Sequence, residues 1–150
     1  TSSAASDVYK RQLVNKAIET ETVISNALRF YVILILLMVS LFCTHLLVID
    51  QFGYFAPDGL LLICYVFNII IAGVLFLFLL FLSKNQPSIL GLGFLITSGF
   101  KFLLFFTLIY PNFEGQAPES KLDFLTFFIP YVAALSLEIY QLAKILNQEE

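Results

Sequence analysis

Four long runs of apolar residues, separated by short polar stretches, dominate the pattern of this chain. The runs cover about residues 30–49, 59–83, 88–110 and 124–146. Each is close to or above the roughly 20 residues that an α-helix needs to cross a hydrocarbon core about 30 Å thick. Charged residues and the turn formers Gly, Pro and Asp lie between the runs. We therefore predict an all-α integral membrane protein, a multi-pass bundle of four transmembrane helices.

The composition supports a membrane protein and excludes one large class of partners. Hydrophobic residues make up 59% of the 150 residues and charged residues only 13%, which is outside the range of soluble domains. The net charge is -3, and no basic stripe is present that would neutralise the phosphates of a nucleic acid. Nucleic-acid binding is therefore excluded, and the lipid bilayer is the partner that the composition predicts.

The residues before the first run have two different interpretations. Residues 1–12 resemble the translated adapter read-through that often precedes metagenomic reading frames, so we expect them to be non-native and outside the fold. Residues 13–29 mix apolar and charged positions at near-helical spacing. Such a juxtamembrane segment is typical of a short amphipathic helix on the membrane surface, and a frayed tail is the alternative.

The charges between the runs are distributed unevenly. The side that holds both termini and the second connection collects Lys16, Arg29, Lys84 and Lys144. The other side has a single Lys121 and five acidic residues, namely Asp50, Asp58, Glu114, Glu119 and Asp123. Cytoplasmic loops carry an excess of Lys and Arg. We therefore predict that both termini are cytoplasmic and that the loop at residues 112–123 lies outside.

A single lysine, Lys101, lies near the middle of the third run. A charged side chain at this depth costs roughly 2.5 to 3.5 kcal/mol on insertion, so we expect it to face the bundle interior. Glu138, in the fourth run, is the candidate partner. Helical side chains lean toward their own N-terminus, and in antiparallel helices this brings the two groups toward one depth. The alternative is that Glu138 reaches the cytoplasmic surface independently of Lys101.

Asn68 and Ser98 complete the set of intramembrane polar candidates. Asn68 lies near the middle of the second run, at a depth from which it would reach Lys101 through Ser98 or Thr97. A transmembrane amide commonly joins helices by hydrogen bonding, which contributes roughly 0.6 to 2 kcal/mol. We favour this structural role for Asn68, and a direct ligand role is the alternative.

The sequence contains no pattern typical of a catalytic or cofactor site. It lacks a Ser/His/Asp set, a metal-ligand cluster, a phosphate-binding loop and a pair of intramembrane histidines. Cys43 and Cys64 stand singly within apolar runs, and we expect both to be small buried side chains. We therefore expect no enzymatic activity, no cofactor and no metal site.

With these residues in view, residues 60–146 resemble the ATP synthase protein I family, small membrane proteins encoded beside the bacterial F-type ATP synthase. The family's Leu-Pro-Asn-like element corresponds to YVFN at residues 65–68, and its Gly-Glu-x-x-Lys-like element to TSGFK at residues 97–101. Asn68 and Lys101 match the asparagine and the lysine of these two family elements. The family's acidic residue falls on Ser98 and its glycine on Thr97, and its tryptophan in the last helix is absent because the chain has no Trp.

The resemblance implies a non-enzymatic protein of the bacterial inner membrane, an assembly or interaction factor for the membrane rotor sector of the ATP synthase. Admission of a divalent cation such as Mg²⁺, as a transporter or channel component, is the alternative. An ion-binding role would need Glu138 to replace the acid that is absent at Ser98. Phenylalanines around Lys101 leave little room for a wet path, so we favour the interaction factor. A structural bundle with an unknown partner and a homo-oligomer also stay open.

Overall fold

The computed structural model describes residues 2–52, 59–112 and 121–147. Its long helices are α1 (Ser2–Phe52), α2 (Leu60–Asn85), α3 (Leu90–Leu104) and α4 (Lys121–Leu146). In this part of the chain, four helical segments are long and apolar enough to cross a membrane. The predicted all-α architecture with four membrane spans is thus confirmed.

The third span is less regular than the sequence predicted. A 3-10 turn, Pro87–Ile89, precedes α3, a π-helical turn, Phe105–Ile109, follows it, and a second 3-10 turn, Tyr110–Asn112, ends the segment. Pro87 suits a helix start because its missing N–H would have no partner there. The sequence predicted one uniform helix over residues 88–110, and no residue pattern marks the π turn, which is a form found frequently at functional sites.

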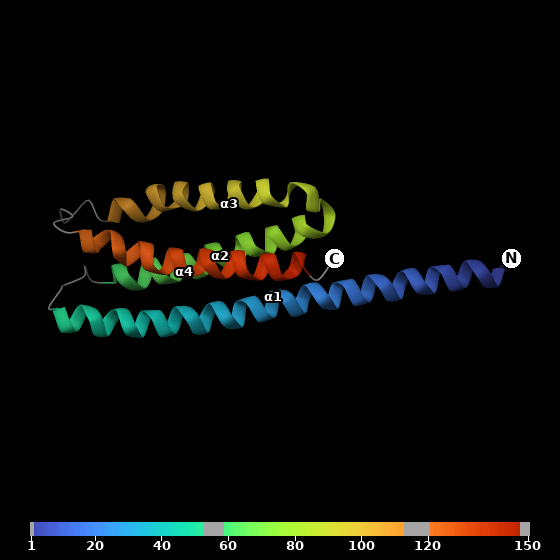
Figure 1. The fold of residues 1–150 in the computed structure, drawn as a ribbon, viewed down its shortest axis with the longest axis horizontal. Helices are drawn as coiled ribbons and strands as arrows, with labels where there is room; N and C mark the ends of the chain where they lie inside the picture. The colour runs from blue at the N-terminus through green and yellow to red at the C-terminus, as the bar shows by residue number, and fades with distance from the viewer. Residues whose placement is uncertain (1, 53–58, 113–120, 148–150) are drawn as a thin grey trace.

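The helices run alternately in opposite directions, with α2 at the centre of the packing (Figure 1). α2 packs against α4, α1 and α3, and α1 also packs against α4. The backbones of α3 and α4 make few close approaches, so long side chains span the distance between them. The N-terminal part of α1, the C-terminal end of α4 and the connection from α2 to α3 lie toward one end of the molecule.

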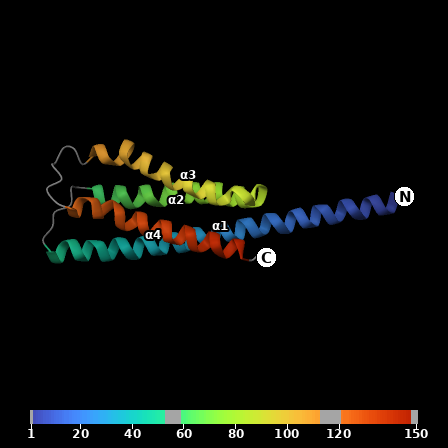
Figure 2. The same ribbon diagram turned by 45° about the horizontal axis from the view of Figure 1, so that its top comes forward.

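α1 continues far beyond the bundle at its N-terminal end (Figure 2). It contains 51 residues and is therefore about 77 Å long at 1.5 Å per residue. No Pro or Gly, the usual causes of a kink, occurs between Ser2 and Phe52. The structure therefore joins residues 13–29 to the first span without the bend that a surface helix would need. The non-native origin of residues 1–12 stays a prediction.

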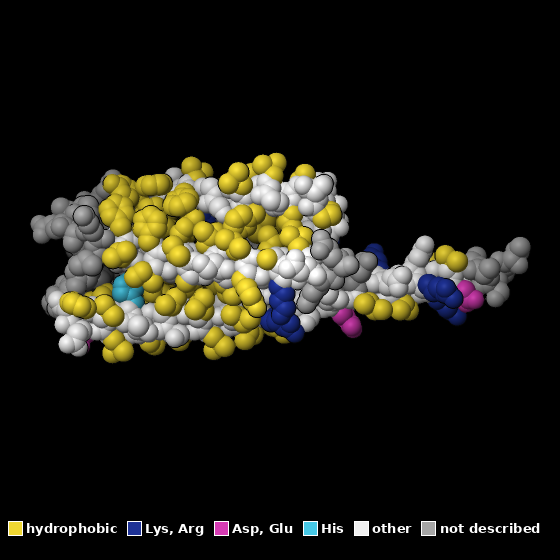
Figure 3. Space-filling view, in the orientation of Figure 1, with side chains coloured by type: hydrophobic (Ala, Val, Ile, Leu, Met, Phe, Trp, Pro, Cys, Tyr) yellow, Lys and Arg dark blue, Asp and Glu magenta, His cyan; other side chains and the backbone are white. Residues whose placement is uncertain are grey.

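The outer surface of the bundle is largely hydrophobic. Yellow side chains cover much of the visible bundle in Figure 3, whereas most of the visible charged groups lie along the α1 extension and where it leaves the bundle. Exposed apolar residues occur on each long helix, as in Leu36, Phe81, Leu95 and Tyr140. Cys64 is buried as expected, but Cys43 is exposed because it lies on a face of α1 that points away from the bundle. This surface suits contact with lipid.

The predicted sidedness gives a direct experiment with introduced cysteines. In a variant without native cysteines, Gln86→Cys should react with a membrane-impermeant maleimide only after the cytoplasmic face is opened, because Gln86 lies in the connection from α2 to α3. Gln116→Cys, in the opposite loop, should react in intact cells. Reaction of Gln86→Cys in intact cells would overturn the topology.

Candidate functional site

A buried ion pair joins α3 and α4 in the middle of the bundle. The Nζ atom of Lys101 lies 2.5 Å from Oε2 of Glu138 and donates hydrogen bonds to both carboxylate oxygens. The two residues are only 3% and 1% exposed. The predicted inward orientation of Lys101 and its pairing with Glu138 are therefore confirmed, and the independent placement of Glu138 at the surface is wrong.

The helical spacing of α3 explains why Lys101 points inward. The buried residues of α3 are Leu90, Gly93, Thr97 and Lys101, which recur every three or four positions and form one face. Gly93 allows α3 to approach α2 closely, because a Cβ atom there would collide with the Leu82 side chain. This face is thus fixed toward the interior by packing, and Lys101 is carried with it.

An aromatic cluster closes the pair on the side of the α3–α4 loop. Phe105 stacks on Phe127 with ring centroids 3.9 Å apart, and Phe127 stacks on Tyr131 at 5.7 Å. Leu60, Cys64 and Ile109 belong to the same buried cluster. Phe105 lies one turn from Lys101 and Tyr131 two turns from Glu138, so this cluster forms an apolar layer on that side of the pair.

A second apolar cluster lies farther along the helices on the opposite side of the pair. It contains Leu79 and Leu82 from α2, Leu90 from α3 and Leu142 from α4, with Phe94 packed against it. On this side the buried residues about one turn from the pair are Leu142 and the polar residues Thr97 and Gln141. Separating the two charges in such surroundings is costly, because each charge has lost its hydration and keeps the other as its main compensation.

The predicted relay from Asn68 to Lys101 is not formed. The Asn68 side chain is buried and its Nδ2 donates to the carbonyl of Cys64 at 2.8 Å, within α2. Thr97 Oγ1 donates to the carbonyl of Phe94 at 2.9 Å, within α3. Asn68 and Thr97 lie near the depth of the ion pair. Each nonetheless donates its hydrogen bond to a backbone carbonyl of its own helix. The expected bond between helices is therefore not made by either donor.

The hydroxyl of Ser98, unlike that of its neighbour Thr97, has no hydrogen-bond partner among the described residues. Its Oγ atom is buried, and among the described residues it is the buried side-chain polar atom without a hydrogen-bond partner. The carboxylate of this site belongs to Glu138, on the facing helix.

Sequence reasoning missed Tyr131 and the contact between His45 and Tyr65. Tyr131 lies seven residues before Glu138, on the same face of α4, and contributes to the aromatic cluster; this heptad spacing was a usable signal. His45 Nδ1 and Tyr65 Oη lie 3.1 Å apart and connect α1 to α2. Neither residue alone indicates its partner in the sequence.

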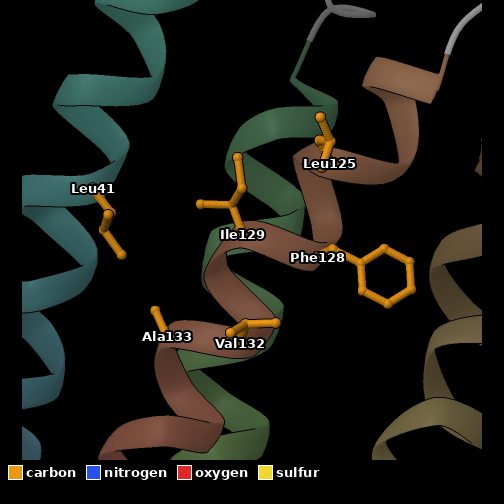
Figure 4. Close-up of a pocket in the computed structure, with 6 residues that line it drawn as sticks. All are labelled: Leu41, Leu125, Phe128, Ile129, Val132 and Ala133. Atoms are coloured by element: carbon orange, nitrogen blue, oxygen red, sulfur yellow. The ribbon is translucent and has the colours of Figure 1, made fainter.

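A shallow apolar groove between α1 and α4 is a weaker candidate (Figure 4). Its volume is about 420 Å³, and it is lined by Leu41 of α1 and by Leu125, Phe128, Ile129, Val132 and Ala133 of α4. Binding sites usually add a few polar groups that orient a ligand, and this lining supplies no polar side chain. In the described part of the chain, no three His, Cys, Asp or Glu residues gather as a metal site either. The ion pair is therefore the candidate functional site.

No protein-family model, curated protein or solved structure matches this chain. The chain is a small membrane protein with four apolar helices, and its bilayer contact follows from the length and hydropathy of those helices.

Proposed function

We propose that this protein is a non-enzymatic interaction factor whose buried Lys101–Glu138 pair fixes the arrangement of its helices. A partner protein in the membrane would then bind a helix surface of defined shape. The observation that carries this proposal is the burial of both charged residues, which are only 3% and 1% exposed and are hydrogen-bonded to each other. A polar pair in that position stabilises a helix arrangement and offers no exposed group for binding solutes.

The main alternative is a cation transporter or channel component. Such a protein needs a continuous wet path past its charged groups. Lys101 and Glu138 are almost fully buried, and the stacked rings of Phe105 and Phe127 begin one turn beyond Lys101. Lys101 would also repel a divalent cation at this depth. These features favour the interaction factor.

The partner that we propose is the membrane sector of the bacterial ATP synthase, in the inner membrane. The support for this partner is the resemblance around Asn68 and Lys101. Glu138 adds to that support, because it places a carboxylate beside Lys101 although Ser98 holds the family's acidic position. A structural bundle without a dedicated partner is the remaining alternative.

Cross-linking and ion flux together test this proposal. After mild cross-linking of native membranes, the tagged protein should recover membrane subunits of the ATP synthase, and a tagged four-span protein of unrelated sequence should not. Purified protein in liposomes should give no Mg²⁺ flux above empty liposomes. Flux that Lys101→Met abolishes would instead establish the transporter, and recovery of no specific protein would favour the structural bundle.

A further inference from the structure

Two polar groups at the ion pair have unused hydrogen-bonding capacity. A lysine ammonium carries three N–H donors. In the part of the chain that the structure describes, Lys101 Nζ donates only to the two oxygens of Glu138. Ser98 Oγ is buried without a partner in the same part of the chain. Buried polar groups are nearly always paired, either with protein atoms or with ordered water, so both groups need an explanation.

The two groups lie close together on one helix. Ser98 and Lys101 are three positions apart, and side chains at this spacing have Cβ atoms about 5–6 Å apart. The Lys101 side chain leans toward the N-terminus of α3, and therefore toward the turn that contains Ser98.

We propose that Ser98 and Lys101 hold a buried water molecule that completes the hydrogen bonding of the ion pair. The water accepts a hydrogen bond from Lys101 Nζ and donates one to Ser98 Oγ. Its second hydrogen is available to a Glu138 carboxylate oxygen. Three hydrogen bonds are the usual number for a buried water. The site exists whether or not the proposed partner is correct.

The chemistry of the site selects water over other ligands. The ligand must present a lone pair to the ammonium group, which excludes a metal cation. Lys101 and Glu138 already neutralise each other, so an anion would bring an uncompensated charge into the membrane interior. Lys101 and Glu138 are almost fully buried, which favours a ligand of the smallest size.

Solid-state NMR of the protein in lipid bilayers, with ¹⁵N-labelled lysine, tests the site directly. Magnetisation from water should reach the Nζ signal of Lys101, which is identified by its loss in Lys101→Met. Ser98→Ala should remove most of this transfer. Thr97→Val is the matched control, because the hydroxyl of Thr97 is already satisfied by Phe94 within the helix, and the transfer should persist.

Thermal unfolding gives a second readout. The direction of the Tm change in Ser98→Ala distinguishes a Ser98 hydroxyl that binds water from one that has no partner. Ser98→Ala should lower Tm if the hydroxyl anchors a water, because the third N–H of Lys101 then loses its acceptor. The same substitution should raise Tm if the hydroxyl is unsatisfied, because it removes a buried polar group without a partner. A higher Tm, or undiminished water transfer in Ser98→Ala, would overturn the proposal.

Discussion

Lys101→Met is expected to lower the free energy of unfolding by about 3 to 5 kcal/mol, because it leaves the carboxylate of Glu138 buried without its counter-charge. Met has nearly the length of Lys and no charge, so the loss reports the ion pair more than the packing. Unfolding of the purified protein by a denaturing detergent would measure the change. Lys16→Met is the matched control, since Lys16 is exposed on the α1 extension and its replacement should change stability by less than about 0.5 kcal/mol.

The double variant Lys101→Met with Glu138→Gln should be more stable than Lys101→Met alone. It removes both charges, and replacing a whole buried pair by neutral groups is often close to neutral in stability, whereas removing one partner is not. The two single variants and the double variant together give a coupling energy. A coupling energy near zero would contradict the pair as a stabilising contact between α3 and α4.

The ion pair was predictable because two simple rules define it. A lysine in the middle of a membrane span has to face inward, and counting residues along two antiparallel helices brings Glu138 close to its depth. The membrane spans were predictable for a similar reason, since the length of an apolar run is directly visible. Both properties depend on position along a helix axis, which the sequence defines well.

Features that depend on rotation about a helix axis were not predictable in the same way. Asn68 and Thr97 lie near the depth of Lys101, yet their hydrogen bonds return to the backbones of α2 and α3. The central position of α2 also follows from which faces pack, and residue depth contains no such information. The π turn after α3 involves ordinary apolar residues, so no side-chain pattern distinguishes it from an α-helical turn.

Gly73→Leu should be the most disruptive change at the contact between α1 and α2. A Cβ atom at Gly73 would lie 2.6 Å from Cε1 of Tyr31, and an aromatic ring yields less readily than the end of a flexible side chain. Beside this contact, Phe30 of α1 stacks on Phe76 of α2 with centroids 3.7 Å apart. A larger residue should therefore push α1 away from α2, at a cost of about 1 to 3 kcal/mol from overpacking.

Gly99→Leu separates this packing effect from the intrinsic effect of losing a glycine. A Cβ atom added at Gly99 would have no other atom within 4 Å, so a leucine there should extend into lipid without a collision. Both substitutions gain helix propensity relative to glycine, by somewhat less than the roughly 0.8 to 1 kcal/mol that separates alanine from glycine. Gly99→Leu should thus unfold at the same detergent concentration as the parent or at a higher one, and Gly73→Leu at a lower one. Equal stability of the two variants would show that Tyr31 does not hold α1 against α2, and the stacking of Phe30 on Phe76 would then carry this contact.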